Sequence, residues 1–148
     1  MMFRGTNSRR LAAVLAVLLL ILTGAACSQY KSNGQRIYLN GTSASGQPIT
    51  PGGFSTPMFT MTCGNCHLAD GRGGPITIMM ARYQVPNITW PVLIRATEDH
   101  PAYTEATLKT AITTGAEPGG ERLLYPMPTW QMSSRDLKDL VGFIKTLK

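Results

Sequence analysis

Two cysteines and a histidine form the most reactive cluster in the sequence, in the run Cys63-Gly64-Asn65-Cys66-His67. Two thiols three residues apart on one turn can reach both vinyl groups of a single porphyrin and form thioethers. The histidine directly after the second cysteine then lies beneath the iron and can bind it. The run therefore predicts one covalently attached c-type haem, held by Cys63 and Cys66, with His67 as an axial ligand of the iron.

Three other kinds of site share part of this run. A redox-active thiol pair normally opens a helix after a strand in a βαβ unit, and no such unit is predicted here. A closed zinc site needs four nitrogen or sulfur ligands, for which the chain beyond its N-terminal segment offers at most Cys63, Cys66, His67 and His100. A plain disulfide would leave His67 unexplained. Haem is the interpretation that accounts for all three side chains.

A second axial ligand must come from elsewhere in the chain. Met127 is the preferred candidate, because it lies well beyond His67 and because prolines on both sides stiffen its loop. Met132 is a rival, and His100 would give bis-histidine ligation. Core or loop filling is the expected role of the other methionines beyond the N-terminal segment: Met58, Met61, Met79 and Met80.

The first 26 residues have the layout of an export signal. A basic stretch precedes an uncharged apolar run at 11–21, and small residues follow at 23–26. The uncharged stretch at 11–26 is shorter than the roughly 20 residues that a transmembrane helix needs. We therefore expect a cleaved signal rather than an uncleaved membrane anchor.

Cys27 follows this segment directly. Residues 22–28 resemble a bacterial lipobox, in which the cysteine becomes the lipidated N-terminus, although Gly24 stands where the pattern prefers a branched apolar residue. Ordinary cleavage would instead leave Cys27 as a free thiol in an oxidising compartment, where it is a liability. We expect lipidation of Cys27, a tether at 27–33, and a location on the periplasmic side of a bacterial membrane.

The rest of the chain predicts an all-α domain at 34–148, with four or five short helices and long loops. A first helix begins near Gly34 and ends at Gly41. A Gly/Ser/Pro-rich insertion follows at about 42–60, and short helical turns are expected at 75–80 and 92–94. No segment has the alternation of a strand.

Two later helices have clearer boundaries. Thr104 is a candidate N-cap and Gly115 a candidate C-cap for the helix at 104–114. The last helix begins after Ser133, and its apolar residues recur at the three–four spacing of an amphipathic helix.

Such a domain is poorly equipped to fold alone. Isolated helices under about 12–15 residues are marginal in water, and about 120 residues rich in loop bury little apolar surface. A large apolar cofactor would complete the core. The N-terminal segment holds three of the fourteen Lys and Arg and none of the eight acids, which leaves +3 of the formal charge of +6. These charges are scattered, so nothing predicts nucleic-acid binding.

Together these motifs resemble the class I cytochromes c, from about Gly34 to the C-terminus. The resemblance implies a small helical fold around one haem, with Met127 in the loop before the closing helix. It also implies that Gly34 and Tyr38 of the first helix meet Gly142 and Phe143 of the last. The insertion at about 42–60 departs from the many members in which the first helix runs almost directly into the haem motif.

The resemblance implies a single-electron carrier and not an enzyme. A quinol-oxidising complex or a dehydrogenase would be the donor, and an oxidase or reductase the acceptor. The alternatives are a fixed subunit of a membrane oxidoreductase complex, and a haem enzyme or gas sensor with a displaceable sixth ligand. Trp90, Trp130 and Tyr125 are expected on or near the ring, and Pro75 near His67.

Overall fold

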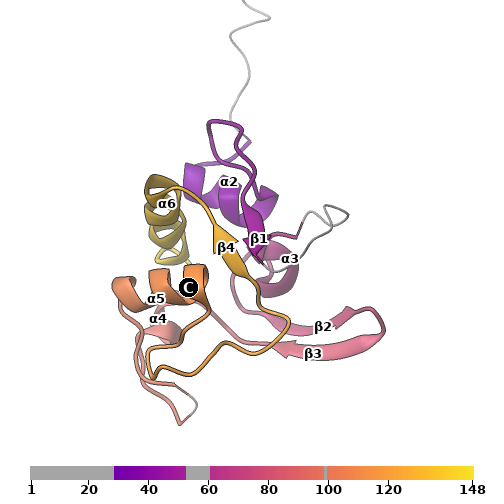
Figure 1. Ribbon diagram of the computed structural model, residues 1–148, viewed down its shortest axis with the longest axis vertical. Coiled ribbons are helices and arrows are strands. Elements are labelled where there is room, and N and C mark those ends of the chain that lie inside the picture. Colours follow the sequence, from indigo (N-terminus) through magenta and orange to yellow (C-terminus); the bar gives the residue numbers. More distant parts are fainter. Residues whose placement is uncertain (1–28, 53–60, 99) are drawn as a thin grey trace, which may run out of the picture.

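The computed structural model describes residues 29–52, 61–98 and 100–148. The expected signal at 1–26, Cys27 and Met58 lie outside the described residues. The described part contains short helices and two pairs of strands (Figure 1). In chain order they are α2 (Asn33–Asn40), β1 (Thr50–Gly52), α3 (Cys63–His67), β2 (Gly74–Ile78), β3 (Ala81–Val85), α4 (Trp90–Leu93), α5 (Glu105–Thr114), β4 (Thr129–Gln131) and α6 (Ser134–Ile144).

The first and last helices, α2 and α6, pack side by side (Figure 1). Gly34 permits this approach, because a Cβ there would overlap the backbone carbonyl of Asp139. The Tyr38 and Phe143 rings meet at 5.2 Å between centroids, as expected. The expected contact of Gly142 is wrong: that residue is exposed, and no described atom outside its neighbours and its own helix backbone lies within 4 Å of where its Cβ would be.

The predicted boundaries of α2 and α5 and the predicted start of α6 are confirmed, whereas α6 ends at Ile144, earlier than the apolar pattern predicts. Gly41 ends α2 in the left-handed conformation, and Gly115 does the same for α5. Thr104 caps α5 by accepting a hydrogen bond from the Thr107 amide, and Ser133 caps α6 by accepting one from the Asp136 amide. Helical periodicity and capping residues act locally, which is why the sequence predicts these ends.

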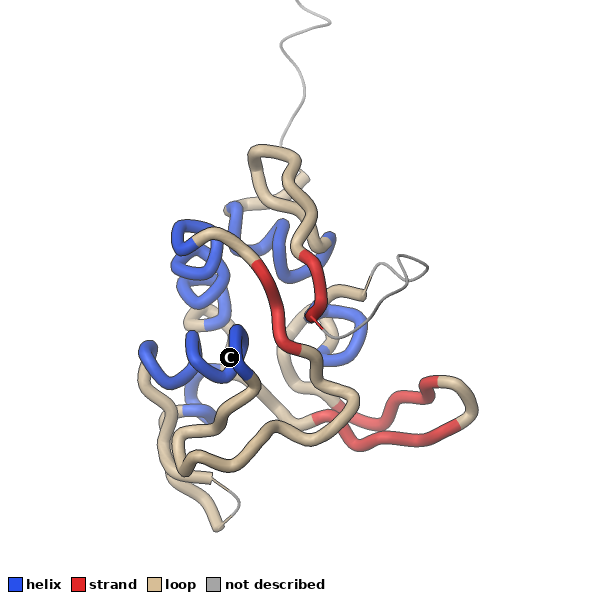
Figure 2. The backbone as a smooth tube through the Cα atoms, viewed as in Figure 1, coloured by secondary structure: helices blue, strands red, loops and turns tan. Residues whose placement is uncertain are grey.

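The expectation of a domain without strands is wrong. Residues 75–80, expected as a helical turn, belong to a hairpin in which β2 and β3 pair antiparallel. Its turn is made by Met79 and Met80, both at positive φ. Hairpin turns of this kind usually carry Asn or Gly, so these two residues do not indicate a turn in the sequence. Figure 2 shows the hairpin projecting from the body of the molecule.

The second pair of strands joins the insertion to the C-terminal part of the chain. β1 pairs antiparallel with β4, with Thr50 opposite Gln131 and Gly52 opposite Thr129. Each strand has three residues, too few for alternation to be recognised in the sequence. This pairing depends on contacts between residues about 80 positions apart.

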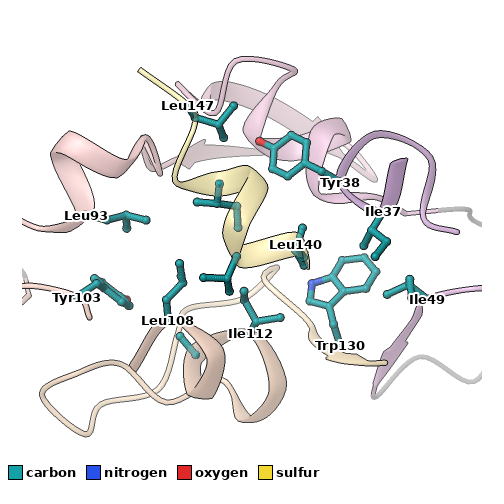
Figure 3. Packing of buried hydrophobic residues seen from close by; sticks show 13 residues of the cluster. Ile37, Tyr38, Ile49, Leu93, Tyr103, Leu108, Ile112, Trp130, Leu140 and Leu147 are labelled. Atoms are coloured by element: carbon teal, nitrogen blue, oxygen red, sulfur yellow. The ribbon is translucent and has the colours of Figure 1, made fainter. Parts of the chain in front are cut away.

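The core lies between α2, α5 and α6 and is closed by residues from the loops (Figure 3). Tyr38 and Leu140 are completely buried at its centre. Ile49, from the insertion, lies beside Trp130 (Figure 3). None of the helices in the described ranges is both long enough and apolar enough to cross a membrane.

Candidate cofactor site

The two cysteines and His67 occupy one short helix, α3, whose N-terminal end is fixed by local hydrogen bonds. The Thr62 side chain accepts from the Asn65 amide at 3.2 Å, and the Asn65 side chain accepts from the Thr62 amide at 2.8 Å. Gly64 lies against α2, because a Cβ there would be 3.0 Å from Leu39. The run therefore forms a capped helical turn seated on the first helix, with Cys63, Cys66 and His67 lining one cavity.

The His67 ring is buried and oriented by a backbone carbonyl. Its Nδ1 lies 3.2 Å from the Pro86 carbonyl oxygen, so Nδ1–H donates and Nε2 is left to bind a metal. Burial lowers the pKa of His67, and the Pro86 hydrogen bond opposes that shift. The neutral ring is the form that binds iron.

Pro86, rather than Pro75, is the proline beside His67. Pro75 lies exposed on β2 and does not line the cavity. Gly73 makes the Pro86 contact possible, since a Cβ at Gly73 would overlap the Val85 and Pro86 carbonyl oxygens. The chain after the haem motif thus folds back so closely that only glycine fits.

The thiols do not have the character of a redox-active pair. Burial raises the pKa of the Cys63 thiol to about 12, and burial also raises that of Cys66. Catalytic dithiols need a lowered pKa instead. Across the described ranges, no three His, Cys, Asp or Glu side chains are placed to hold a metal ion, so the four ligands of a closed zinc site are not gathered there.

The cavity has a volume of about 730 Å³, within the roughly 300–1,000 Å³ of cofactor sites. Met127, His100 and Met61 line it together with the haem motif, whereas Met132 does not and packs against the core instead. Apolar side chains from the core form much of the remaining wall: Val85, Leu93, Leu108, Ala111, Ile112, Leu140 and Ile144.

The walls of this cavity fit a haem. An apolar interior suits the porphyrin ring, and Trp130 supplies one polar group. Its Nε1 is fully buried and has no hydrogen-bond partner among the described residues, although buried donors are almost always paired. Trp130 lines the cavity, so an acceptor on the cofactor, such as a propionate oxygen, would satisfy this donor.

The predictions for the other two aromatic residues, Tyr125 and Trp90, have different outcomes. Tyr125 lines the cavity as expected, but Trp90 does not; Lys145 lies over its ring instead, 5.4 Å from the centroid. Tyr103 lines the cavity and was missed. Burial, followed by the charge of Glu117, raises the Tyr103 pKa to about 12. A tyrosine just before a helix cap carries no sequence signal for such a position.

Comparison with known families identifies the chain. The family model for cytochrome c matches residues 56–148, which is more than half of the sequence and includes α3, the cavity walls and Met127. No match was found among curated proteins, nor among solved structures. The chain therefore belongs to the cytochrome c family, with a covalently bound c-type haem and a role in haem-based electron transfer.

Proposed function

We propose that this protein is an exported, membrane-tethered carrier of single electrons, with His67 and Met127 as the two axial ligands of its haem iron. The observation that supports this best is that both side chains line the cavity that Cys63 and Cys66 also line. Two protein ligands leave no open position on the iron for a substrate. This arrangement suits a carrier, whereas a haem enzyme or gas sensor needs an open or displaceable position on the iron.

In this proposal the chain's own groups would hold the haem and orient the side chains that bind its iron. Cys63 and Cys66 each form a thioether, and the Pro86 carbonyl keeps Nε2 of His67 as the free ring nitrogen. Pro126 and Pro128 stiffen the loop around Met127. The haem supplies a one-electron change between ferric and ferrous iron, and a methionine ligand raises its reduction potential relative to histidine.

Partner proteins would exchange electrons at the rim of the cavity. Leu124 and Tyr125 line the cavity yet are 84% and 62% exposed. Apolar side chains therefore meet the solvent beside the cofactor, where a donor such as a quinol-oxidising complex or dehydrogenase, and an oxidase or reductase as acceptor, would bind. A lipid on Cys27 would keep the carrier near such partners on the periplasmic side of the membrane.

Three matched variants test the axial ligand in the holoprotein. Met127→Ala should keep the covalent haem, lose the weak long-wavelength band that methionine ligation gives ferric haem, and lower the reduction potential. Met132→Ala and His100→Ala should leave both properties unchanged. If the wild-type protein lacks this band, and His100→Ala but not Met127→Ala alters the spectrum and the potential, ligation is bis-histidine and the proposal is wrong.

Two further measurements test the carrier role and the tether. Ferric wild-type protein should be low-spin and bind cyanide only slowly; a high-spin spectrum that shifts at once with cyanide would indicate a haem enzyme or gas sensor.

Cys27→Ala should move the protein from the membrane to the soluble fraction. An unchanged membrane fraction, together with an intact mass that shows no lipid, would exclude lipidation of Cys27.

A further inference from the structure

The first part of the insertion, residues 41–52, is an ordered segment that we name the strap. The Ser43 amide donates to the Gln47 carbonyl at 2.8 Å, and the Ile49 amide donates to the Gly41 carbonyl at 2.7 Å. The Ala44 amide also donates to Asn33 of α2 at 2.6 Å. Ser43 is 1% exposed. The first two bonds close the strap on itself and the third ties it to the first residue of α2, so it is not slack chain.

The far end of the strap reaches the chain that follows Met127. β1 pairs with β4, which begins only two residues beyond Met127. The approach is close, since a Cβ at Gly52 would lie 2.5 Å from the Thr129 Oγ1. Ile49 is buried beside Trp130 of β4 (Figure 3). The strap therefore contacts β4 through both backbone pairing and core packing.

Apart from β4, the loop that carries Met127 is held by a ring contact between Tyr125 and Tyr83, by packing of Leu123 and Met127 against the core, and by two backbone hydrogen bonds. On its N-terminal side, the Leu123 amide donates to the Gly115 carbonyl at 2.8 Å. Within it, the Met127 amide donates to the Leu124 carbonyl at 3.1 Å, and Leu124 is largely exposed. Loops with exposed side chains and few buried contacts open locally at low free-energy cost. Pairing of β1 with β4 restricts the motion of this loop at its C-terminal end.

We propose that the strap is a positioning element for Met127: by clamping β4 it opposes local opening of the loop and so keeps the methionine sulfur at the iron. This proposal rests on the proposed role of Met127 as a ligand. The strap lies outside the family match, whereas Met127 and β4 lie inside it. The strap thus supports a segment that belongs to the part of the chain that matches the family.

The test compares two core truncations of equal burial in the ferric holoprotein. Ile49 belongs to the strap and Leu147 does not, and each is 7% exposed. Ile49→Ala should raise the affinity for added imidazole, which competes with Met127, on the order of tenfold, equivalent to about 1.4 kcal/mol. Leu147→Ala should leave this affinity near that of wild type, although both variants unfold at lower denaturant concentration.

A second readout separates failure of the strap from failure of the ligand assignment. Amide hydrogen exchange at Met127 should become faster in Ile49→Ala and in Gly52→Val, but not in Leu147→Ala, whether or not Met127 binds iron. Ile49→Val serves in place of Ile49→Ala if that variant does not fold. Equal effects of the strap and control variants on imidazole affinity and exchange would overturn the proposal.

Discussion

The indole Nε1 of Trp130 is a buried donor that finds no acceptor among the described residues. It belongs to a residue that lines the cavity. A buried donor that finds no acceptor costs about 1–3 kcal/mol, whereas a hydrogen bond to a charged acceptor contributes about 1.5–3 kcal/mol. Binding an anionic group of the cofactor would change the first situation into the second.

Trp130→Phe should therefore destabilise the holoprotein by about 1.5–3 kcal/mol and lower its reduction potential, because an unpaired propionate places more negative charge beside the iron. Trp90→Phe is the control, since Trp90 does not line the cavity, and it should leave the potential unchanged. Denaturant unfolding and potentiometry measure both effects. Equal potentials in the two variants would show that Trp130 donates to nothing on the cofactor.

Tyr38 holds the backbone directly after the haem motif. Its buried hydroxyl donates to the Leu68 carbonyl at 2.8 Å, and Leu68 has a positive φ of 62°. Tyr38→Phe removes this bond while the Gly71 amide still donates to the same carbonyl at 3.3 Å, so it should lower the free energy of unfolding by about 0.5–1.5 kcal/mol. Tyr83→Phe, at a half-buried ring on the hairpin, should change it much less. Denaturant unfolding of both variants decides between them.

At the scale of elements, the crossing of α2 and α6 depends on one missing side chain. Gly34→Ala places a Cβ into the Asp139 carbonyl, and backbone atoms cannot rotate away as a side chain can. We expect a loss of about 1–3 kcal/mol or more in thermal or denaturant unfolding. The helices would have to separate to accommodate one methyl group.

Gly142→Ala is the matched change on the same pair of helices. A Cβ there meets nothing within 4 Å, and alanine has a higher helix propensity than glycine by about 1 kcal/mol. This variant should therefore be more stable than wild type by up to that amount. If Gly142→Ala lowered the free energy of unfolding as much as Gly34→Ala does, the overlap of the Gly34 Cβ with α6 would not explain the effect.

At the scale of the whole molecule, α3, α5 and α6 together line one cavity of about 730 Å³. Core side chains on α5 and α6, including Leu108 and Leu140, form its wall. Packed interiors tolerate few voids larger than a water molecule. The helices in the described ranges are also short, between 4 and 11 residues. We therefore expect the fold to depend on the haem as a structural element.

Preventing attachment should consequently prevent stable folding. The double variant Cys63→Ser/Cys66→Ser should show no cooperative thermal transition and little near-ultraviolet circular dichroism. Met127→Ala, which keeps both thioether positions, should still unfold cooperatively. A colourless double variant with a sharp transition would show that the protein part forms its core without the cofactor.

Local chemistry explains what could be predicted before the structure was known. The haem motif, the ends of α5 and the amphipathic pattern of α6 depend on residues within a few positions of one another. The motif specifies its cofactor because both thiols and the imidazole must fit one ring. Capping residues act on the nearest amides. Such features are written in consecutive residues, so the sequence alone was sufficient for them.

Contacts between distant segments decided the rest. Pro86 became the partner of His67 because Gly73 lets the chain return so closely, and β1 found β4 across about 80 residues. The hairpin turn at Met79 and Met80 adopts positive φ without glycine or asparagine. These features depend on which surfaces meet once the core has closed. Pairing of that kind leaves no periodic pattern in short strands, so only the folded chain reveals it.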